Sequence, residues 1–252
     1  MNTHPASLFR VLALTVALGS VASASVISWN YDRFGTISPS GVAGVVPVAN
    51  WSNSWPSNPV VDLVDSSGAA TTLDLAYSSF GSWSISGSSP GADLDGTFNR
   101  NLLNGYLNSG PAGWGPPVTT SSVTLTQIPY AAYNVIVYFS SDVAGREGQV
   151  GDGATTFYFN TVGQPSINGA NALFASTNDT AGTYLTGANY AVFTGLSGGS
   201  QTFTVAMRDN DEWGGIAGFQ VVEAAAVPEP ASAVALAGLA GLLCAGSRRR
   251  RG

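Results

Sequence analysis

Short runs of β-branched and aromatic residues recur along the chain, separated by clusters of Gly, Pro, Asn, Asp and Ser. In residues 123–128 and 202–207, apolar side chains alternate with Thr or Gln, which is typical of a strand with one buried face. Residues 133–139 are almost continuously apolar, as in a central strand covered on both faces. The pattern predicts ten strands, at residues 26–29, 60–64, 72–77, 82–85, 123–128, 133–139, 156–159, 190–193, 202–207 and 216–222.

No stretch of the body has the period of an amphipathic helix, and only residues 99–107 could form a helical turn. Many short strands without such helices favour an all-β fold of two packed antiparallel sheets, a β-sandwich. Hydrophobic residues make up 44% of the chain, and 31 Gly and 13 Pro in 252 residues are too few for a low-complexity sequence. We therefore predict one β-sandwich domain over residues 25–226, flanked by segments 1–24 and 227–252.

The N-terminal segment has the three parts of a secretory signal peptide. Arg10 supplies the positive charge, residues 11–18 form an apolar run, and Ala22 and Ala24 occupy the small-residue positions that signal peptidase requires. Cleavage is predicted before Ser25. An uncleaved anchor helix is the alternative, but this apolar run is much shorter than the ~20 residues that span a bilayer.

The C-terminal segment begins with Pro228-Glu229-Pro230, continues with an uncharged Ala-, Gly- and Leu-rich run at 231–246, and closes with Arg248, Arg249, Arg250 and Arg251. A helix over 231–246 would reach ~24 Å, slightly less than a ~30 Å hydrocarbon core, so bilayer thinning would have to cover the difference. The arginines place the end of this helix in the cytoplasm and the body outside. We expect a transmembrane helix at 231–246.

This order of triplet, apolar helix and arginine cluster resembles the PEP-CTERM protein-sorting signal of bacteria. The resemblance implies recognition by an exosortase, a membrane-embedded peptidase that cuts near the triplet. The chain would then be anchored only transiently in the inner membrane and be transferred to the cell surface or an extracellular matrix. Signal peptidase and the exosortase are the implied processing partners. A plain C-terminal anchor is the alternative.

The body carries few charges, and most of them are acidic. Between Ser25 and Ala226 there are four arginines, no lysine and 14 acidic residues, a net charge of −10. Such a body repels phosphate backbones, so nucleic acid is excluded as a partner. The only histidine, His4, and the only cysteine, Cys244, lie in the flanking segments. Triads with His or Cys, zinc sites built from these residues and disulfides are therefore excluded from the body.

The second half of the body contains the apolar strand at 133–139, Gly145-Arg146 and the closing run Gly215-Ile216-Ala217-Gly218-Phe219-Gln220-Val221-Val222. With these features, residues 122–222 resemble the galactose-binding-like and carbohydrate-module-like jelly rolls of secreted bacterial proteins. The resemblance implies a jelly-roll sandwich and, less specifically, sugar binding.

The densest acidic cluster, Asp209, Asp211 and Glu212, lies in the turn before the last predicted strand. Calcium takes six to eight oxygen ligands, so these three carboxylates are a candidate calcium site. The turn is not an EF-hand loop, because Trp213 and Gln220 stand where that motif requires ligands. A solvated hairpin loop without metal is the alternative.

Trp213 follows this cluster directly and is our candidate for stacking on a sugar ring. Exposed aromatic faces stack on sugars while a few polar side chains bind the hydroxyl groups. The predicted ligand site consists of Trp213, Arg208, Arg146, Asp209 and Asp211. The alternative is that the tryptophans of loop-like stretches cover the ends of the core, as Trp51, Trp55, Trp114 and Trp213 itself could do.

Three functions fit these features: binding of envelope or matrix polysaccharide, a structural role at the surface or in the matrix without a small ligand, and glycoside hydrolysis. Hydrolysis needs two carboxylates about 5–10 Å apart, and no motif singles out a pair. We therefore predict an exported, non-enzymatic polysaccharide-binding protein.

Overall fold

A computed structural model describes residues 24–110, 119–209 and 212–224 of the chain. Over these residues the fold is all-β, with two large sheets, one small hairpin and two short helices, which confirms the predicted β-sandwich. Nearly all of the predicted signal peptide and the predicted transmembrane helix at 231–246 lie outside the described residues. Within them, no helix has the length and hydropathy needed to cross a membrane.

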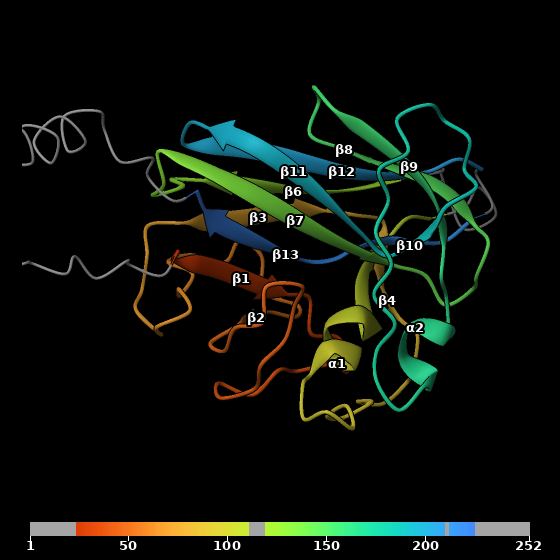
Figure 1. Cartoon of the computed structure of the whole chain (residues 1–252), viewed down its shortest axis with the longest axis horizontal. Helices are drawn as coiled ribbons and strands as arrows, with labels where there is room; N and C mark the ends of the chain where they lie inside the picture. The colour runs from red at the N-terminus through yellow and green to blue at the C-terminus, as the bar shows by residue number, and fades with distance from the viewer. Residues whose placement is uncertain (1–23, 111–118, 210–211, 225–252) are drawn as a thin grey trace, which may run out of the picture.

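The first sheet has five strands in the order β11-β7-β13-β1-β2, and its central strand is the last one of the chain (Figure 1). β13 runs antiparallel to both of its neighbours, so that Phe219 pairs with Trp29 of β1 and with Val137 of β7. The strands are β11 (Tyr190–Ser197), β7 (Ala132–Ser140), β13 (Gly215–Glu223), β1 (Val26–Asn30) and β2 (Ser52–Asn53).

The second sheet has six strands in the order β10-β9-β8-β12-β6-β3 and packs on the first. Its strands are β10 (Gly187–Ala188), β9 (Thr156–Thr161), β8 (Glu147–Gly151), β12 (Ser200–Met207), β6 (Thr120–Thr126) and β3 (Asp74–Ser78). The small hairpin pairs β4 (Gly81–Ser84) with β5 (Gly105–Asn108). The helices α1 (Asn99–Asn104) and α2 (Pro165–Asn168) lie beside each other at one end of the molecule (Figure 1).

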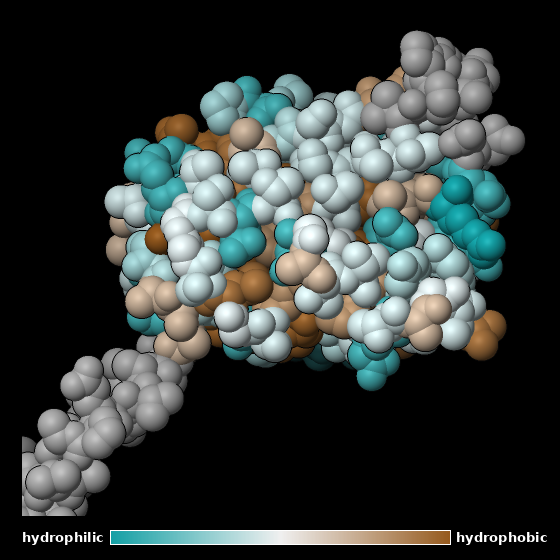
Figure 2. Space-filling model, turned by 90° about the horizontal axis from the view of Figure 1, so that it is seen from above, coloured by the Kyte–Doolittle hydropathy of each residue, from teal (hydrophilic) through white to brown (hydrophobic). Residues whose placement is uncertain are grey.

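The main core lies between the two sheets, and a second core lies on the outer side of the five-stranded sheet. Alternate residues of β7 divide between them: Phe139 stacks on Phe159 in the main core at 4.0 Å between ring centroids, while Tyr138 packs in the second core. The buried pattern of this strand confirms the prediction of a central strand covered on both faces. The face of the molecule that is shown in Figure 2 is mostly polar or of intermediate hydropathy, with hydrophobic side chains in small groups.

Two predicted elements differ from the structure. Residues 60–64 form only isolated bridges, Val60 with Leu75 and Val64 with Ala70, instead of a continuous strand. Residues 99–107 begin as the helix α1 but continue as β5, because the chain turns extended at Gly105 to pair with β4. The finer expectation of a jelly roll stays a prediction.

Candidate ligand-binding site

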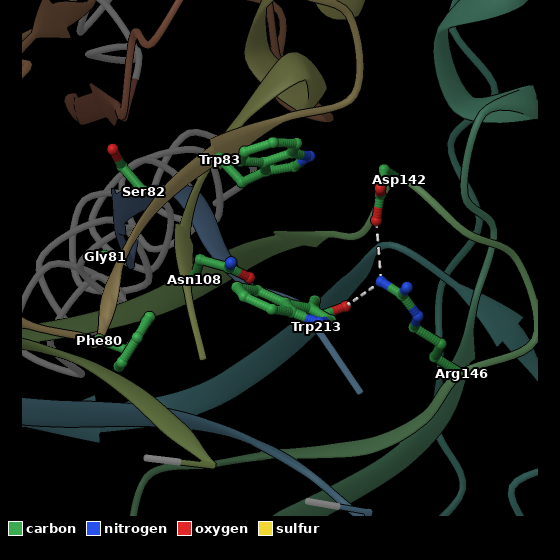
Figure 3. Close-up of a pocket in the computed structure, with 8 residues that line it drawn as sticks. All are labelled: Phe80, Gly81, Ser82, Trp83, Asn108, Asp142, Arg146 and Trp213. Carbon is green, nitrogen blue, oxygen red and sulfur yellow. Dashed lines mark hydrogen bonds and ion pairs between the residues drawn. The ribbon is translucent and has the colours of Figure 1, made fainter. Parts of the chain in front are cut away.

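A pocket of about 450 Å³ opens where the β4–β5 hairpin meets the start of β13 (Figure 3). This volume lies within the range of small-ligand sites. Trp83 and Trp213 lie on opposite sides of the pocket, and Asp142 and Arg146 lie together at its edge. The lining consists of three aromatic residues, one glycine and four polar or charged residues: Phe80, Trp83, Trp213, Gly81, Ser82, Asn108, Asp142 and Arg146.

The backbone around Trp213 is fixed by three surrounding segments. Its carbonyl oxygen accepts hydrogen bonds from Ser141 Oγ and Arg146 Nη1, both at 2.8 Å. Ser109, directly after β5, donates through its backbone N–H to Gly214 O at 3.1 Å and through its hydroxyl to Glu212 O at 3.1 Å. Trp213 is therefore held in place before any ligand arrives, which lowers the entropic cost of binding.

Two glycines allow the walls of the pocket to come together. A Cβ on Gly215 would lie 1.7 Å from the carbonyl oxygen of Leu107, so β5 can approach β13 only because this residue has no side chain. A Cβ on Gly110 would lie 2.1 Å from the ring of Phe80, which packs against the bare backbone there. Phe80 in turn contacts Trp213 edge-on, with 6.2 Å between ring centroids.

Arg146 lies at the pocket, as predicted, but its hydrogen bonds are made within the protein. Its Nη1 atom lies 2.9 Å from Ser141 Oγ, 2.8 Å from Asp142 Oδ1 and 2.8 Å from the Trp213 carbonyl oxygen (Figure 3). Nη1 carries only two N–H groups, so three acceptors occupy it fully. Through Nη1, Arg146 holds the Trp213 loop against the end of β7, while Nε and Nη2 carry the three other N–H groups of the guanidinium.

Asn108 offers the pocket an acceptor. The residue is 1% exposed, and its Oδ1 atom has no hydrogen-bond partner among the described residues. An unpaired buried acceptor destabilises a fold by about 1–3 kcal/mol, so such a group in a pocket wall favours a ligand that donates a hydrogen bond.

Two other residues of the predicted site, Arg208 and Asp209, are not among the described residues that line this pocket. Arg208 is exposed, pairs with Glu147 and lies over the ring of Tyr184, with Cζ 4.7 Å from the ring centroid. Asp209 is exposed, and Asp211 lies outside the described residues. The structure therefore brings together Trp213 and Arg146 and places Arg208 elsewhere.

Glu212 has a partly buried carboxyl group whose Oε2 atom has no partner among the described residues. Burial, and next the charge of Asp209, raise the pKa of this carboxyl above its ordinary value. Within the part of the chain that is described, no three acidic, His or Cys side chains are grouped to hold a metal. Because Asp211 is not described, the calcium site at Asp209, Asp211 and Glu212 stays a prediction.

Six lining residues are not among those predicted from the sequence: Phe80, Gly81, Ser82, Trp83, Asn108 and Asp142. Trp83 falls in the predicted strand at 82–85, but its strand β4 belongs to neither large sheet and leaves the side chain 47% exposed. The run Phe80-Gly81-Ser82-Trp83, two aromatics among small residues, is the signal that could have indicated an exposed aromatic surface.

The pocket and the described chain ends lie at opposite ends of β13. The strand starts at Gly215, two residues after Trp213, and ends at Glu223. Nine residues of strand place these points roughly 25 Å apart. The site therefore lies at the end of the sandwich remote from Glu223.

The fold and the pocket define the body as an all-β sandwich domain with a ligand-sized aromatic site. Residues 226–251 match the family model of the PEP-CTERM protein-sorting motif, which confirms the resemblance seen around Pro228-Glu229-Pro230. The chain thus carries a PEP-CTERM sorting motif, which supports export with membrane-anchored sorting before release and implies processing by an exosortase. No curated protein and no solved structure gave a significant match.

Proposed function

We propose that the exported sandwich binds polysaccharide of the cell envelope or matrix through the pocket between Trp83 and Trp213, without catalysis. The observation that carries the proposal is the gathering of three aromatic side chains around one pocket, with Phe80 39% and Trp83 47% exposed. Exposed apolar surface of this kind is unfavourable unless it serves an interaction, and aromatic faces stack on the apolar faces of sugar rings. The likeness of the closing strand to that of galactose-binding-like jelly rolls supports the same function.

The polar groups of the pocket favour a neutral sugar over an acidic one. Asn108 Oδ1 is an acceptor without a partner among the described residues, and sugar hydroxyls are donors. The positive charge of Arg146, which would attract a sugar carboxylate, is offset by the adjacent carboxylate of Asp142, whose Oδ1 atom lies 2.8 Å from Nη1. The acidic body would also repel an anionic chain.

The pocket is better suited to binding than to hydrolysis. Among the described residues that line it, Asp142 is the only carboxylate, and its Oδ1 atom accepts from Arg146 at 2.8 Å. Glycoside hydrolysis requires a second carboxylate on the other side of the scissile bond. This arrangement supports a non-enzymatic role.

Affinity electrophoresis tests the proposal. The exported protein, purified from its host, is run in native gels cast with galactomannan, xylan, mixed-linkage β-glucan or polygalacturonate. We expect retardation by at least one neutral polysaccharide and loss of that retardation in Trp213→Ala and Trp83→Ala. Leu94→Ala, at a side chain that is 83% exposed and does not line the pocket, is the matched control. A protein that no polysaccharide retards, but that stays with the cell-surface fraction, would instead have the structural role.

A further inference from the structure

Exposed aromatic side chains continue beyond the pocket. Phe34 is 43% and Trp55 42% exposed, and their rings lie 6.1 Å apart. The guanidinium carbon of Arg33 lies 5.6 Å from the ring of Phe34, 5.8 Å from that of Trp55 and 5.6 Å from that of Trp83. We call Phe34, Trp55 and Trp83, with Arg33 among them, the aromatic platform. Trp83 belongs both to the platform and to the pocket wall.

Arg33 fixes the platform to the pocket. Its Nη1 atom donates to the backbone oxygen of Ser82 and, at 2.6 Å, to Ser82 Oγ, and Ser82 lines the pocket. The same guanidinium attracts the three surrounding rings through cation–π interactions. The rings are therefore held at fixed positions next to the site, although nearly half of the surface of each remains open to solvent.

The backbone of Phe34 is in a conformation that is unfavourable for a bulky residue. Its φ is 58°, in the left-handed region where a bulky residue is an outlier and where strain is of order 1–3 kcal/mol. The buried side chain of Asn104 holds this turn by donating from Nδ2 to the Phe34 carbonyl oxygen at 2.9 Å. The side chain stays 43% exposed beside Trp55, so this conformation does not serve to bury the ring completely. Strain at a partly exposed aromatic residue fits a role in binding.

We propose that the aromatic platform is a second subsite for the polysaccharide held in the pocket, so that the protein binds an internal stretch of chain several sugar units long. This inference rests on the proposed function. The occupant follows from adjacency: Trp83 lines the pocket, and its ring shares the Arg33 guanidinium with those of Trp55 and Phe34, so a chain that extends from the pocket past Trp83 comes to the platform. A protein that recognised only a terminal sugar would need the pocket and no platform.

Calorimetric titration with oligosaccharides of increasing length tests the platform. The probes are manno-, xylo- and cello-oligosaccharides, each from the disaccharide to the octasaccharide, added to the exported protein. We expect the octasaccharide of the bound series to bind about tenfold or more tightly than the disaccharide, as for the gain of an aromatic anchor. Trp55→Ala should remove this gain and leave disaccharide binding unchanged, and Leu94→Ala should change neither.

Phe34→Asn provides a second variant that cannot be confused with misfolding. Asn adopts positive φ more readily than Phe, so this change should raise the melting temperature while lowering octasaccharide affinity. Equal affinity of the wild type for short and long probes would overturn the platform. An unchanged length dependence in Trp55→Ala and Phe34→Asn would also overturn it. In both cases Trp213→Ala still tests the pocket separately. Failure of the wild type to bind any probe would overturn the proposed function and the platform with it.

Discussion

The backbone N–H of Glu223 donates to the carbonyl oxygen of Ser25 at 2.9 Å, and the Ser25 N–H donates to Glu223 Oε2 at 3.3 Å. The first residue of the predicted mature chain thus pairs with the last residue of β13. The sorting motif begins at residue 226, three positions later. Both segments that are predicted to be processed therefore leave the sandwich at the same edge.

We predict that the mature protein starts at Ser25. Cleavage there would leave a new amino group 3.3 Å from Glu223 Oε2, where the positive charge gains a partner. Intact-mass and terminal-peptide mass spectrometry of the protein from its native host should show Ser25 as the first residue and a C-terminus near Pro228-Glu229-Pro230. Native protein that still carries His4 and Arg251 would contradict the prediction.

Arg146→Lys should weaken glycan binding although the charge is kept. All three contacts of Arg146 come from its terminal Nη1 atom, and the shorter lysine side chain does not extend its Nζ atom as far, so the contacts with Asp142, Ser141 and the Trp213 carbonyl should be lost or lengthened. We expect a loss of about 1.5–3 kcal/mol in the free energy of unfolding, together with reduced retardation in affinity gels. Arg208→Lys, at the exposed pair with Glu147, is the control and should leave the melting temperature and the retardation unchanged.

Gly215→Ala should destabilise the fold strongly. A Cβ at this position would lie 1.7 Å from the Leu107 carbonyl oxygen, so β5 would have to move away from β13. We expect a loss of about 3 kcal/mol or more in the free energy of unfolding, measured by urea denaturation. At Gly87 nothing lies within 4 Å of an added Cβ, and Gly87→Ala should be close to neutral. Equal stability of the two variants would mean that the hairpin is not packed this tightly.

The raised pKa of Glu212 predicts a specific pH dependence. Burial, followed by the charge of Asp209, raises the pKa of the folded carboxyl above its ordinary 4.5, so the folded state binds more protons than the unfolded state in that window. The stability contributed by this group is therefore present at low pH and is lost as pH rises through the folded pKa. Glu212→Gln should be more stable than the wild type at neutral pH, with the difference disappearing below the unfolded pKa.

Melting temperatures of both proteins, recorded against pH, check this expectation. Asp65, Asp95 and Asp179 have lowered pKa values because their carboxylates accept hydrogen bonds, chiefly from Ser67, Thr97 and Thr183 respectively. They destabilise both proteins equally as pH falls and cancel in the difference. A difference that stays constant over the whole pH range would show that Glu212 does not titrate differently in the folded state.

The fold could be predicted because the core strands have hydrophobic patterns that are visible in their own sequences. In β6 and β12 apolar and polar residues alternate, and in β7 the apolar residues are almost continuous. The structure confirms the burial that these patterns predict. β8 was missed because its sequence, Glu-Gly-Gln-Val-Gly, has one large apolar residue. Its Gly148 is required by the neighbouring Phe159, since an added Cβ would lie 2.7 Å from that ring. The need for glycine at this position arises from the pairing of β8 with β9, which cannot be read from the local sequence of β8.

Of the residues that line the pocket, the sequence predicted only two, and each of them lies in a loop just before a strand. Trp213 stood out because it follows an acidic turn, and Arg146 because it is one of four arginines in the body. Trp83 and Asn108 reach the same pocket through the β4–β5 hairpin, whose approach to β13 depends on Gly215. Arg208 is close to Trp213 in sequence, but β12 directs it toward Glu147 and Tyr184 instead.

β13 connects the pocket directly to the C-terminal segment, because it begins two residues after Trp213 and ends at Glu223. Whenever the chain is held by its C-terminus while Trp213 is engaged, tension runs along the axis of the central strand. β1 and β7 flank that strand in antiparallel register, so their hydrogen bonds are loaded together in shear and are not peeled apart one at a time. This orientation of β13 favours resistance to a pulling force applied between a ligand bound at Trp213 and the C-terminal segment.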